Sequence, residues 1–323
     1  MEFFRQTKTI AFMGKSKMAV IISVVLVLTS WAILATKGLN YGIDFAGGTV
    51  VQVQYSAEAP MKLIRETLAQ NDLYKGAQIT EFGSPEEIII KLKTSSKDVT
   101  EDIGDVTREQ LKGTGEFEIR RVDMVGPKVG SELREKGITA MLLAILGILI
   151  YVAFRFEWRF AVASVVALVH DISIALGAIS LVSMDVNLDV LAALLTLLGY
   201  SLNDTIIVFD RIREGITGSK STTLSDVIDE SVTKTLSRTT LTSLTTFFVV
   251  LTLFMWGGEI IHAFAFTLLI GIIVGTYSSI FVASPILLWL GFDIKNYRVM
   301  LAQKAKLAAE KDKLRAQFEQ GTI

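Results

Sequence analysis

Six long apolar runs constrain this chain more than any other feature of its sequence. They cover residues 18–36, 138–154, 160–183, 186–209, 239–256 and 263–290. Each is close to the roughly 20 residues that an α-helix needs to cross the hydrocarbon core of a bilayer. Because a backbone in lipid must satisfy its own hydrogen bonds, such runs form helices there. The sequence therefore predicts a polytopic α-helical membrane protein with six transmembrane helices.

The first run, 18–36, has to be distinguished from a cleaved signal peptide. It is longer than a signal peptide's apolar region, and Leu34-Ala35-Thr36 is a poor cleavage site. We expect residues 1–17 to be a short N-terminal segment before a retained first helix. The remaining helices then occupy residues 137–290, and residues 291–323 form a basic tail.

Composition excludes several kinds of site. The chain has no cysteine, which excludes disulfides and thiolate metal sites, and its two histidines, His170 and His262, are too far apart for a zinc motif. The formal net charge of −1 combines nearly uncharged apolar runs with a basic tail, so it gives no indication of a nucleic-acid partner. We expect membrane lipids as the surroundings, and no cofactor.

Residues 37–136 have the pattern of a small soluble domain. Strands are predicted at 50–55, 78–82, 88–92 and 117–125, and helices at 61–69 and 96–112. This βαββαβ order is that of an α+β ferredoxin-like domain. The glycine-rich segment 41–49 before it lacks the Gly-Lys-Ser/Thr ending of a phosphate loop, which favours a tight turn from a membrane helix into a strand.

Basic residues predict the orientation. Lys and Arg are frequent at the N-terminus, around 155–159, in 210–238 and in the tail, and are absent from the short loops near 183–187 and 257–260. By the positive-inside rule both termini are cytoplasmic. The domain 37–136 then faces the opposite, periplasmic side.

Asp204 is the polar group that most needs an explanation. A carboxylate inside a membrane helix costs roughly 2.5–3.5 kcal/mol on insertion scales. Helical spacing places it on one face with Asp189, Thr196 and Tyr200, and with Ser201 and Asn203 beside that face. This arrangement favours a hydrated path along the helix, with Asp204 as an ion-responsive carboxylate.

Arg238 opens the next apolar run and is the predicted partner of Asp204. The two helices are antiparallel, so Asp204 and Arg238 are expected at similar depth, and Thr242 continues the face of Arg238. An arginine beside the carboxylate would keep it ionised until a cation arrives. The plainer interpretation of Arg238 is a helix-end residue whose side chain extends to the membrane surface.

Other polar and small residues have two interpretations as well. His170-Asp171, inside the third run, is either a proton relay or a pair satisfied locally by packing. Serine and threonine in membrane helices are more often packing residues than ion ligands. Gly271, Gly275 and Ser279 recur at a spacing of four, which is typical of a helix-contact face.

These motifs together resemble the SecD/SecF family of the resistance-nodulation-division superfamily, and within it the SecF subunits. The resemblance is carried by GIDFAGGT at 42–49, VGPKVG at 125–130, FRFEWR at 154–159, HD at 170–171, GYSLNDTIIVFDRIRE at 199–214 and RTTLTS at 238–243. They occur in the family's order and extend over most of the chain.

The resemblance implies a function that spacing does not show. SecF-like proteins pair with SecD to complete a twelve-helix unit, associate with the SecYEG channel in the bacterial inner membrane, and use the proton- or sodium-motive force to assist late export of unfolded polypeptide. YajC and YidC are further implied neighbours. Matched to the family motifs, Asp204 is the ion-coupling carboxylate and Arg238 its partner, with Asn203, Tyr200, Ser201, Thr242, Asp189, His170 and Asp171 as the candidate ion path.

Other functions stay open at this point. Half of a lipid or small-molecule exporter of the same superfamily is the main alternative, although such exporters usually carry larger external domains. An intramembrane aspartyl protease using Asp171 and Asp204 lacks the Tyr-Asp and Gly-x-Gly-Asp signatures. A scaffold without ion coupling would differ only in the role of Asp204. Oxygen ligands around Asp204 suit either H⁺ or Na⁺.

Overall fold

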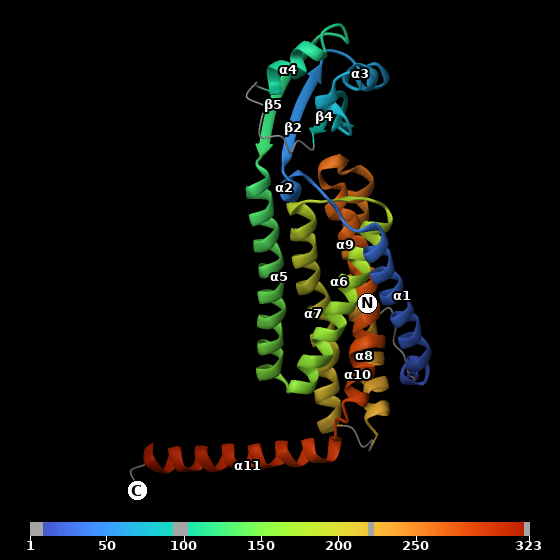
Figure 1. Ribbon diagram of the computed structural model, residues 1–323. Coiled ribbons are helices and arrows are strands. Elements are labelled where there is room, and N and C mark those ends of the chain that lie inside the picture. The colour runs from blue at the N-terminus through green and yellow to red at the C-terminus, as the bar shows by residue number, and fades with distance from the viewer. Residues whose placement is uncertain (1–8, 93–102, 219–222, 320–323) are drawn as a thin grey trace.

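A bundle of long helices carries a small α+β domain at one end and a crossing helix at the other. The structure is a computed structural model, and it describes residues 9–92, 103–218 and 223–319. Helix α11 (Ile294–Glu319) runs across the far end of the bundle, roughly perpendicular to the other helices (Figure 1). The two ends therefore carry different structures.

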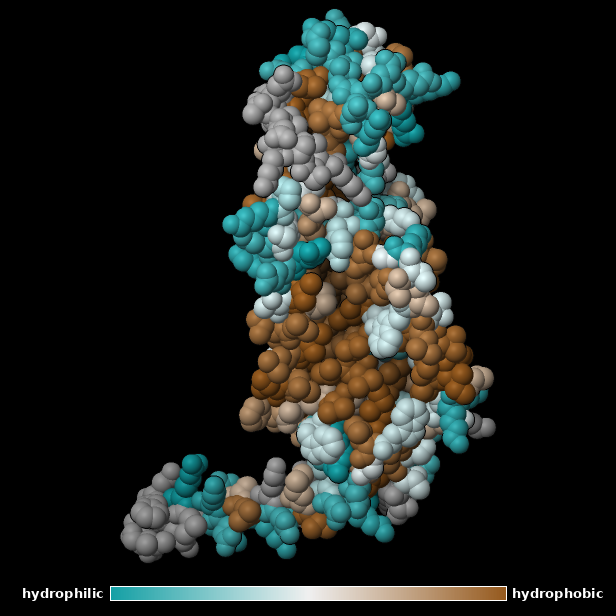
Figure 2. All heavy atoms as spheres, viewed as in Figure 1, coloured by the Kyte–Doolittle hydropathy of each residue, from teal (hydrophilic) through white to brown (hydrophobic). Residues whose placement is uncertain are grey.

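Six helical segments are long and apolar enough to cross a membrane. They are α1 (Ser16–Lys37), which follows a 3₁₀ turn (Met13–Lys15), α5 (Pro127–Arg155), α6 (Trp158–Leu181), α7 (Leu188–Gly218), α8 (Leu224–Trp256), and α9 (Gly258–Ser278), which continues through a π-helical turn (Ser279–Ala283) into α10 (Ser284–Trp289). Figure 2 shows apolar side chains gathered on the middle of the bundle. The six predicted spans are confirmed as helices.

Helices α7 and α8 extend well beyond the predicted spans into the polar segment 210–237. Their extensions pack through buried apolar residues, Ile212 and Ile216 on α7 against Val227, Ile228 and Val232 on α8. Thr223 caps α8 by accepting a hydrogen bond from the backbone N–H of Asp226 at 3.3 Å. Hydropathy averaging hides this helical hairpin because its polar residues outnumber the buried ones.

The domain at the other end is one four-stranded sheet with helices. Its elements are β2 (Gly48–Tyr55), α3 (Met61–Leu68), a 3₁₀ turn (Asp72–Tyr74), β3 (Gln78–Phe82), β4 (Ser84–Leu92), α4 (Ile103–Gln110) and β5 (Phe117–Val125). The strands lie in the order β3-β4-β2-β5, and all neighbours are antiparallel. The predicted order of strands and helices is observed. The start of the helix predicted at 96–112 lies outside the described residues.

Glycines allow the domain to sit directly on the bundle. The short helix α2 (Ile43–Ala46) ends at Gly47 and Gly48, whose φ angles are +79° and +149°. A Cβ on Gly47 would lie 2.8 Å from Cα of Pro127, and a Cβ on Gly130 would lie 2.9 Å from the Gly47 nitrogen. These approaches explain the glycine-rich turn, which joins a membrane helix to a strand as predicted.

Two short parallel strands tie the start of this junction to the bundle. Strand β1 (Asn40–Tyr41) pairs with β6 (Asp185–Val186) in the loop between α6 and α7. The carboxylate of Asp44 accepts a hydrogen bond from the backbone N–H of Leu188, the first residue of α7, at 3.0 Å. A negative charge is stabilising at a helix N-terminus.

We expect Gly47→Ala to destabilise the protein far more than Gly76→Ala. Both glycines have φ near +78°, so both substitutions carry the left-handed strain of about 1–2 kcal/mol. Only Gly47 also meets a neighbouring backbone, which adds about 1–3 kcal/mol of overpacking, whereas nothing lies within 4 Å of a Cβ at Gly76. Thermal unfolding of the purified variants in detergent measures the difference. Equal melting temperatures would show that the junction is loosely packed.

Candidate functional site

A fully buried carboxylate, Asp171, joins three membrane helices. It lies on α6, and its Oδ2 accepts hydrogen bonds from the hydroxyls of Ser201 on α7 at 2.5 Å and Ser278 at the end of α9 at 2.9 Å. Its Oδ1 lies 2.9 Å from Nδ1 of His170. Hydrogen bonds to all these partners offset the cost of burying the carboxyl group. Asp171 is therefore an organising contact of the bundle.

His170 extends this cluster toward α1. Its ring is 5% exposed and stacks on Tyr277, with the ring centroids 6.3 Å apart. Tyr277 donates a hydrogen bond to the backbone carbonyl of Ala19 at 2.7 Å and accepts one from Ser23 at 3.2 Å. The Nε2 atom of His170 is buried with no partner among the described residues. The predicted His170-Asp171 pair is thus in contact, and one ring nitrogen stays available.

Asp204 forms a second cluster, with neutral partners. It lies on α7, is 1% exposed, and accepts a hydrogen bond from the hydroxyl of Ser243 on α8 at 3.3 Å. Ser243 in turn accepts one from Thr276 on α9 at 2.7 Å. In the described part of the chain no basic side chain pairs with Asp204. A single long hydrogen bond leaves this buried carboxyl group less well satisfied than Asp171.

The predicted Asp204–Arg238 ion pair is not formed in this structure. Ser243, which does face Asp204, lies five residues after Arg238, a separation of about 7.5 Å along a helix. Arg238 is exposed on α8 and makes no ion pair with the described residues. Counting from the ends of the apolar runs placed Asp204 and Arg238 at equal depth. This estimate of the register between α7 and α8 is wrong by more than one helical turn, because both helices continue beyond those ends.

The remaining predicted path residues separate into inner and outer positions. Ser201 and Asp204 are buried, whereas Asp189, Thr196 and Asn203 are exposed. Residues four apart drift by about 40° around a helix, so a stripe inferred from such steps turns out of the core over its length. Two residues are intermediate in exposure. Tyr200 has a buried hydroxyl with no hydrogen-bond partner among the described residues, and the hydroxyl of Thr242 on α8 donates to carbonyls of its own helix.

Sequence reasoning missed the polar residues of the last membrane helix that complete both clusters. Thr276 donates a hydrogen bond to Ser243 in the Asp204 cluster, and Ser278 donates one to Asp171 in the other cluster. The π-helical turn begins directly after Ser278, and Ser284 donates a hydrogen bond to the carbonyl of Ser279 at 3.0 Å, just before Pro285. Such π turns occur frequently at functional sites. The available signal was small polar residues closely followed by a proline within an apolar run.

The predicted contact face of that helix is confirmed for its two glycines. A Cβ on Gly271 would lie 2.5 Å from a methyl carbon of Leu197, and one on Gly275 would lie 3.1 Å from Cβ of Ser201. Small residues let helix backbones approach closely in membranes. Gly275 thus brings α9 next to Ser201, so that Ser201 and Ser278 reach the same carboxylate.

The fold and these clusters define a class: multi-pass membrane proteins with an α+β domain outside the bundle and carboxylates inside it. Two family models match this chain, the SecD/SecF GG motif at residues 32–59 and the C-terminal part of the protein export membrane protein SecD/SecF at residues 106–293. The second match covers more than half of the chain. The chain therefore belongs to the SecD/SecF family of protein export membrane proteins, on the side of the SecF translocase subunits.

Individual relatives agree with this assignment. Protein translocase subunit SecF of Helicobacter pylori is 50% identical over 323 residues, with 100% of both chains covered. The SecF subunit of Vibrio alginolyticus is 46% identical over 97% of this chain and 99% of its own. The crystal structure of SecDF from Thermus thermophilus matches with a TM-score of 0.76 and 34% identity, and covers 90% of this chain. This chain spans 40% of that SecDF chain.

Proposed function

We propose that this chain acts with a SecD partner as an auxiliary subunit of Sec protein export and that it uses an ion gradient. The proposal places the protein in the bacterial inner membrane, beside the SecYEG channel, where it assists late translocation of unfolded polypeptide. SecF relatives that match the full chain support the export role. The match to part of a longer SecDF chain supports a SecD partner that completes a twelve-helix unit.

The same proposal assigns the two ends of the bundle to opposite sides of the membrane. Basic residues are frequent at the end where α1 begins and α11 lies, which supports a cytoplasmic location of that end. The α+β domain is then periplasmic. The strand order β3-β4-β2-β5 supports a ferredoxin-like fold for it, since the first and third strands of the domain lie in the centre.

The observation that carries the coupling proposal is the burial of Asp204 with one neutral partner. An ionised carboxylate there lacks a compensating charge, so a proton or a sodium ion bound to it would lower its cost. Moving one charge across 100 mV is worth about 2.3 kcal/mol. This energy is large enough to shift the packing of α7 against α8, the two helices that Asp204 and Ser243 connect.

Selective collapse of the gradients tests this function. Inverted membrane vesicles that contain the complex first translocate a preprotein with ATP until it is held at a late, incomplete stage. Completion from this late intermediate is then measured. A proton ionophore and a sodium ionophore are added in separate experiments. We expect one of the two to stop completion and the other to leave it unchanged. Completion at the same rate with both gradients collapsed would contradict ion-driven export.

Arg238 gives a second test. We expect Arg238→Leu to lose most gradient-dependent completion and Arg238→Lys to keep part of it, because lysine keeps a positive charge on α8, five residues before the Ser243 that contacts Asp204. The measurement is the rate of late translocation in the same vesicles, with SecD association checked by co-purification. If both variants behave like the parent, Arg238 is only a helix-end residue.

A further inference from the structure

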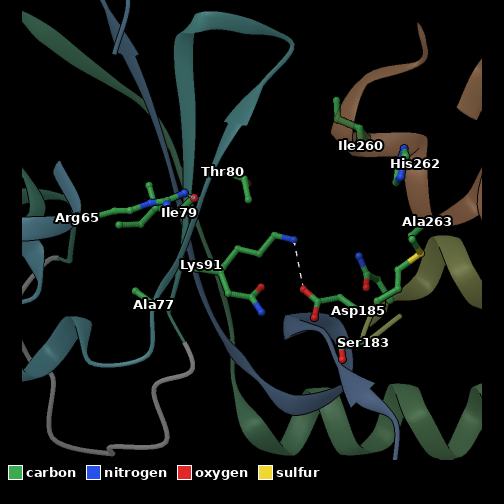
Figure 3. Close-up of a pocket in the computed structure, with 13 residues that line it drawn as sticks. Arg65, Ala77, Ile79, Thr80, Lys91, Ser183, Asp185, Ile260, His262 and Ala263 are labelled. Atoms are coloured by element: carbon green, nitrogen blue, oxygen red, sulfur yellow. Dashed lines mark hydrogen bonds and ion pairs between the residues drawn. The ribbon is translucent and has the colours of Figure 1, made fainter. Parts of the chain in front are cut away.

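A cleft separates the α+β domain from the end of the bundle, and one ion pair crosses it. The cleft has a volume of about 610 Å³, and its lining includes β3 and β4 on the domain side and the α6–α7 loop and the start of α9 on the bundle side. Lys91 extends from β4 toward Asp185, with Nζ 3.5 Å from Oδ2 (Figure 3). Within the described ranges it is the one ion pair that links the sheet to the bundle.

Asp185 is held rigidly on the bundle side. It lies in β6, paired with β1, and its Oδ1 accepts a hydrogen bond from the side-chain amide of Asn40. The same loop is fixed by the backbone N–H of Gly42, which donates to Val186 at 3.0 Å. Because β6 connects α6 to α7, a displacement of these two helices, which carry Asp171 and Asp204, would displace Asp185 as well.

The domain has its chain connections at a different place. The chain enters the sheet through Gly47 and Gly48 at the start of β2, and it leaves through Gly126 between β5 and α5. These two connections lie together, because Gly130 packs onto Gly47. Strands β2 and β5 are neighbours, whereas β4 and β3 extend the sheet away from them. Rotation about the glycine connections would therefore change the width of the cleft and the distance from Lys91 to Asp185.

We infer that Lys91 and Asp185 form a latch that sets the position of the α+β domain relative to helices α6 and α7. When the pair is closed the cleft is narrow, and a displacement of α6 and α7 reaches the domain through Asp185. This inference rests on the proposed function only where it concerns transmission to export. The existence of the latch depends only on the Lys91–Asp185 ion pair and the cleft, and not on export.

The strength of the pair suits a contact that must open and close. The side chains are 30% and 15% exposed, so solvent screens the attraction only in part. Exposed pairs typically shift an equilibrium by a factor of about 1.4 to 5. We expect removal of Lys91 to change the ratio of closed to open domain positions by a factor at the upper end of that range.

Spin-label distances test the latch without any export assay. The chain has no cysteine, so Glu81→Cys on β3 and Ile260→Cys on α9 introduce two unique labels on opposite sides of the cleft. Both positions are exposed and outside the ion pair. We expect a narrow distance distribution in the complex with its SecD partner, and a shift toward longer distances after Lys91→Ala. Lys62→Ala, at an exposed lysine of α3 in the same domain, is the matched control.

A charge swap separates the ion pair from local structural damage. Lys91→Asp combined with Asp185→Lys restores opposite charges, and Asn40 can turn its amide oxygen toward the new lysine. We expect the double variant to recover the parental distances, while each single variant lengthens them. An unchanged distribution in Lys91→Ala, or no recovery in the double variant, overturns the latch.

Export measured in the same variants tests the transmission step. We expect Lys91→Ala to reduce gradient-dependent completion at least about twofold and the charge swap to restore it, with ATP-driven translocation unchanged. Altered distances with unaltered export would overturn transmission through this pair. If the parent shows no gradient dependence at all, the proposed function fails, whereas the distance result still decides whether the latch exists.

Discussion

Replacing Asp204 by asparagine is expected to remove gradient-dependent export while the complex still assembles. Asparagine has nearly the same shape as aspartate and can still accept the hydrogen bond from Ser243, but it cannot bind and release a proton, and it lacks the charge that attracts a cation. The burial of Asp204 among neutral groups makes this the change with the largest functional effect. Late translocation in inverted vesicles, with the ATP-driven motor bypassed, measures it.

Asp189→Asn is the matched control for this prediction. Asp189 lies on the same helix, but its side chain is exposed near the start of α7. We expect that variant to keep at least about half of the parental completion rate. Full gradient-dependent export in Asp204→Asn would falsify the coupling role and leave a scaffold function for the chain.

Replacing Asp171 by alanine is expected to destabilise the bundle itself. The change leaves the hydroxyl of Ser201 and one nitrogen of His170 without their acceptor, whereas the hydroxyl of Ser278 keeps the carbonyl of Gly275 at 3.2 Å. An unsatisfied buried polar group costs about 1–3 kcal/mol. A total of about 3 kcal/mol or more corresponds to a melting temperature lower by about 6–12 °C. Thermal unfolding in detergent, followed by the loss of monodisperse protein, measures this effect.

Ser164→Ala provides the control on the same helix. Ser164 is fully buried on α6, and its hydroxyl has no partner among the described residues, so its removal should leave stability nearly unchanged. Asp171→Asn is expected to fall between the two, because one oxygen acceptor remains. If Asp171→Ala has the same melting temperature as Ser164→Ala, the cluster does not hold the helices together, and the relay interpretation of His170-Asp171 gains support.

Different parts of this protein were predictable to different degrees. Hydropathy predicts the six membrane helices because burial in lipid demands long apolar segments. Alternation and turn residues predict the strands of the domain, since a half-buried strand has a period of two. The helical extensions after Phe209 and before Thr239 were not visible, because only a few apolar residues at helical spacing mark them.

The candidate site was predicted in its residues and not in its partners. Asp204, Asp171 and His170 stand out because a titratable group in a membrane helix is expensive. Ser243, Thr276 and Ser278 did not stand out, since serine and threonine are common in such helices. Only the packed helices show that these hydroxyls reach the carboxylates and that Arg238 does not.

The sequence alone thus determined the number of membrane helices and the place of the small domain between the first two. It also identified the carboxylates inside the membrane helices, whose energetic cost has to be explained by a role. Tertiary structure alone decided the register of α7 against α8, the separation of Asp171 and Asp204 into two clusters, and the Lys91–Asp185 contact. The physical reason is the distance along the chain over which each property is set. Hydropathy and helical period are local properties, whereas a partner on another helix depends on where both helices end and how closely their small residues let them pack.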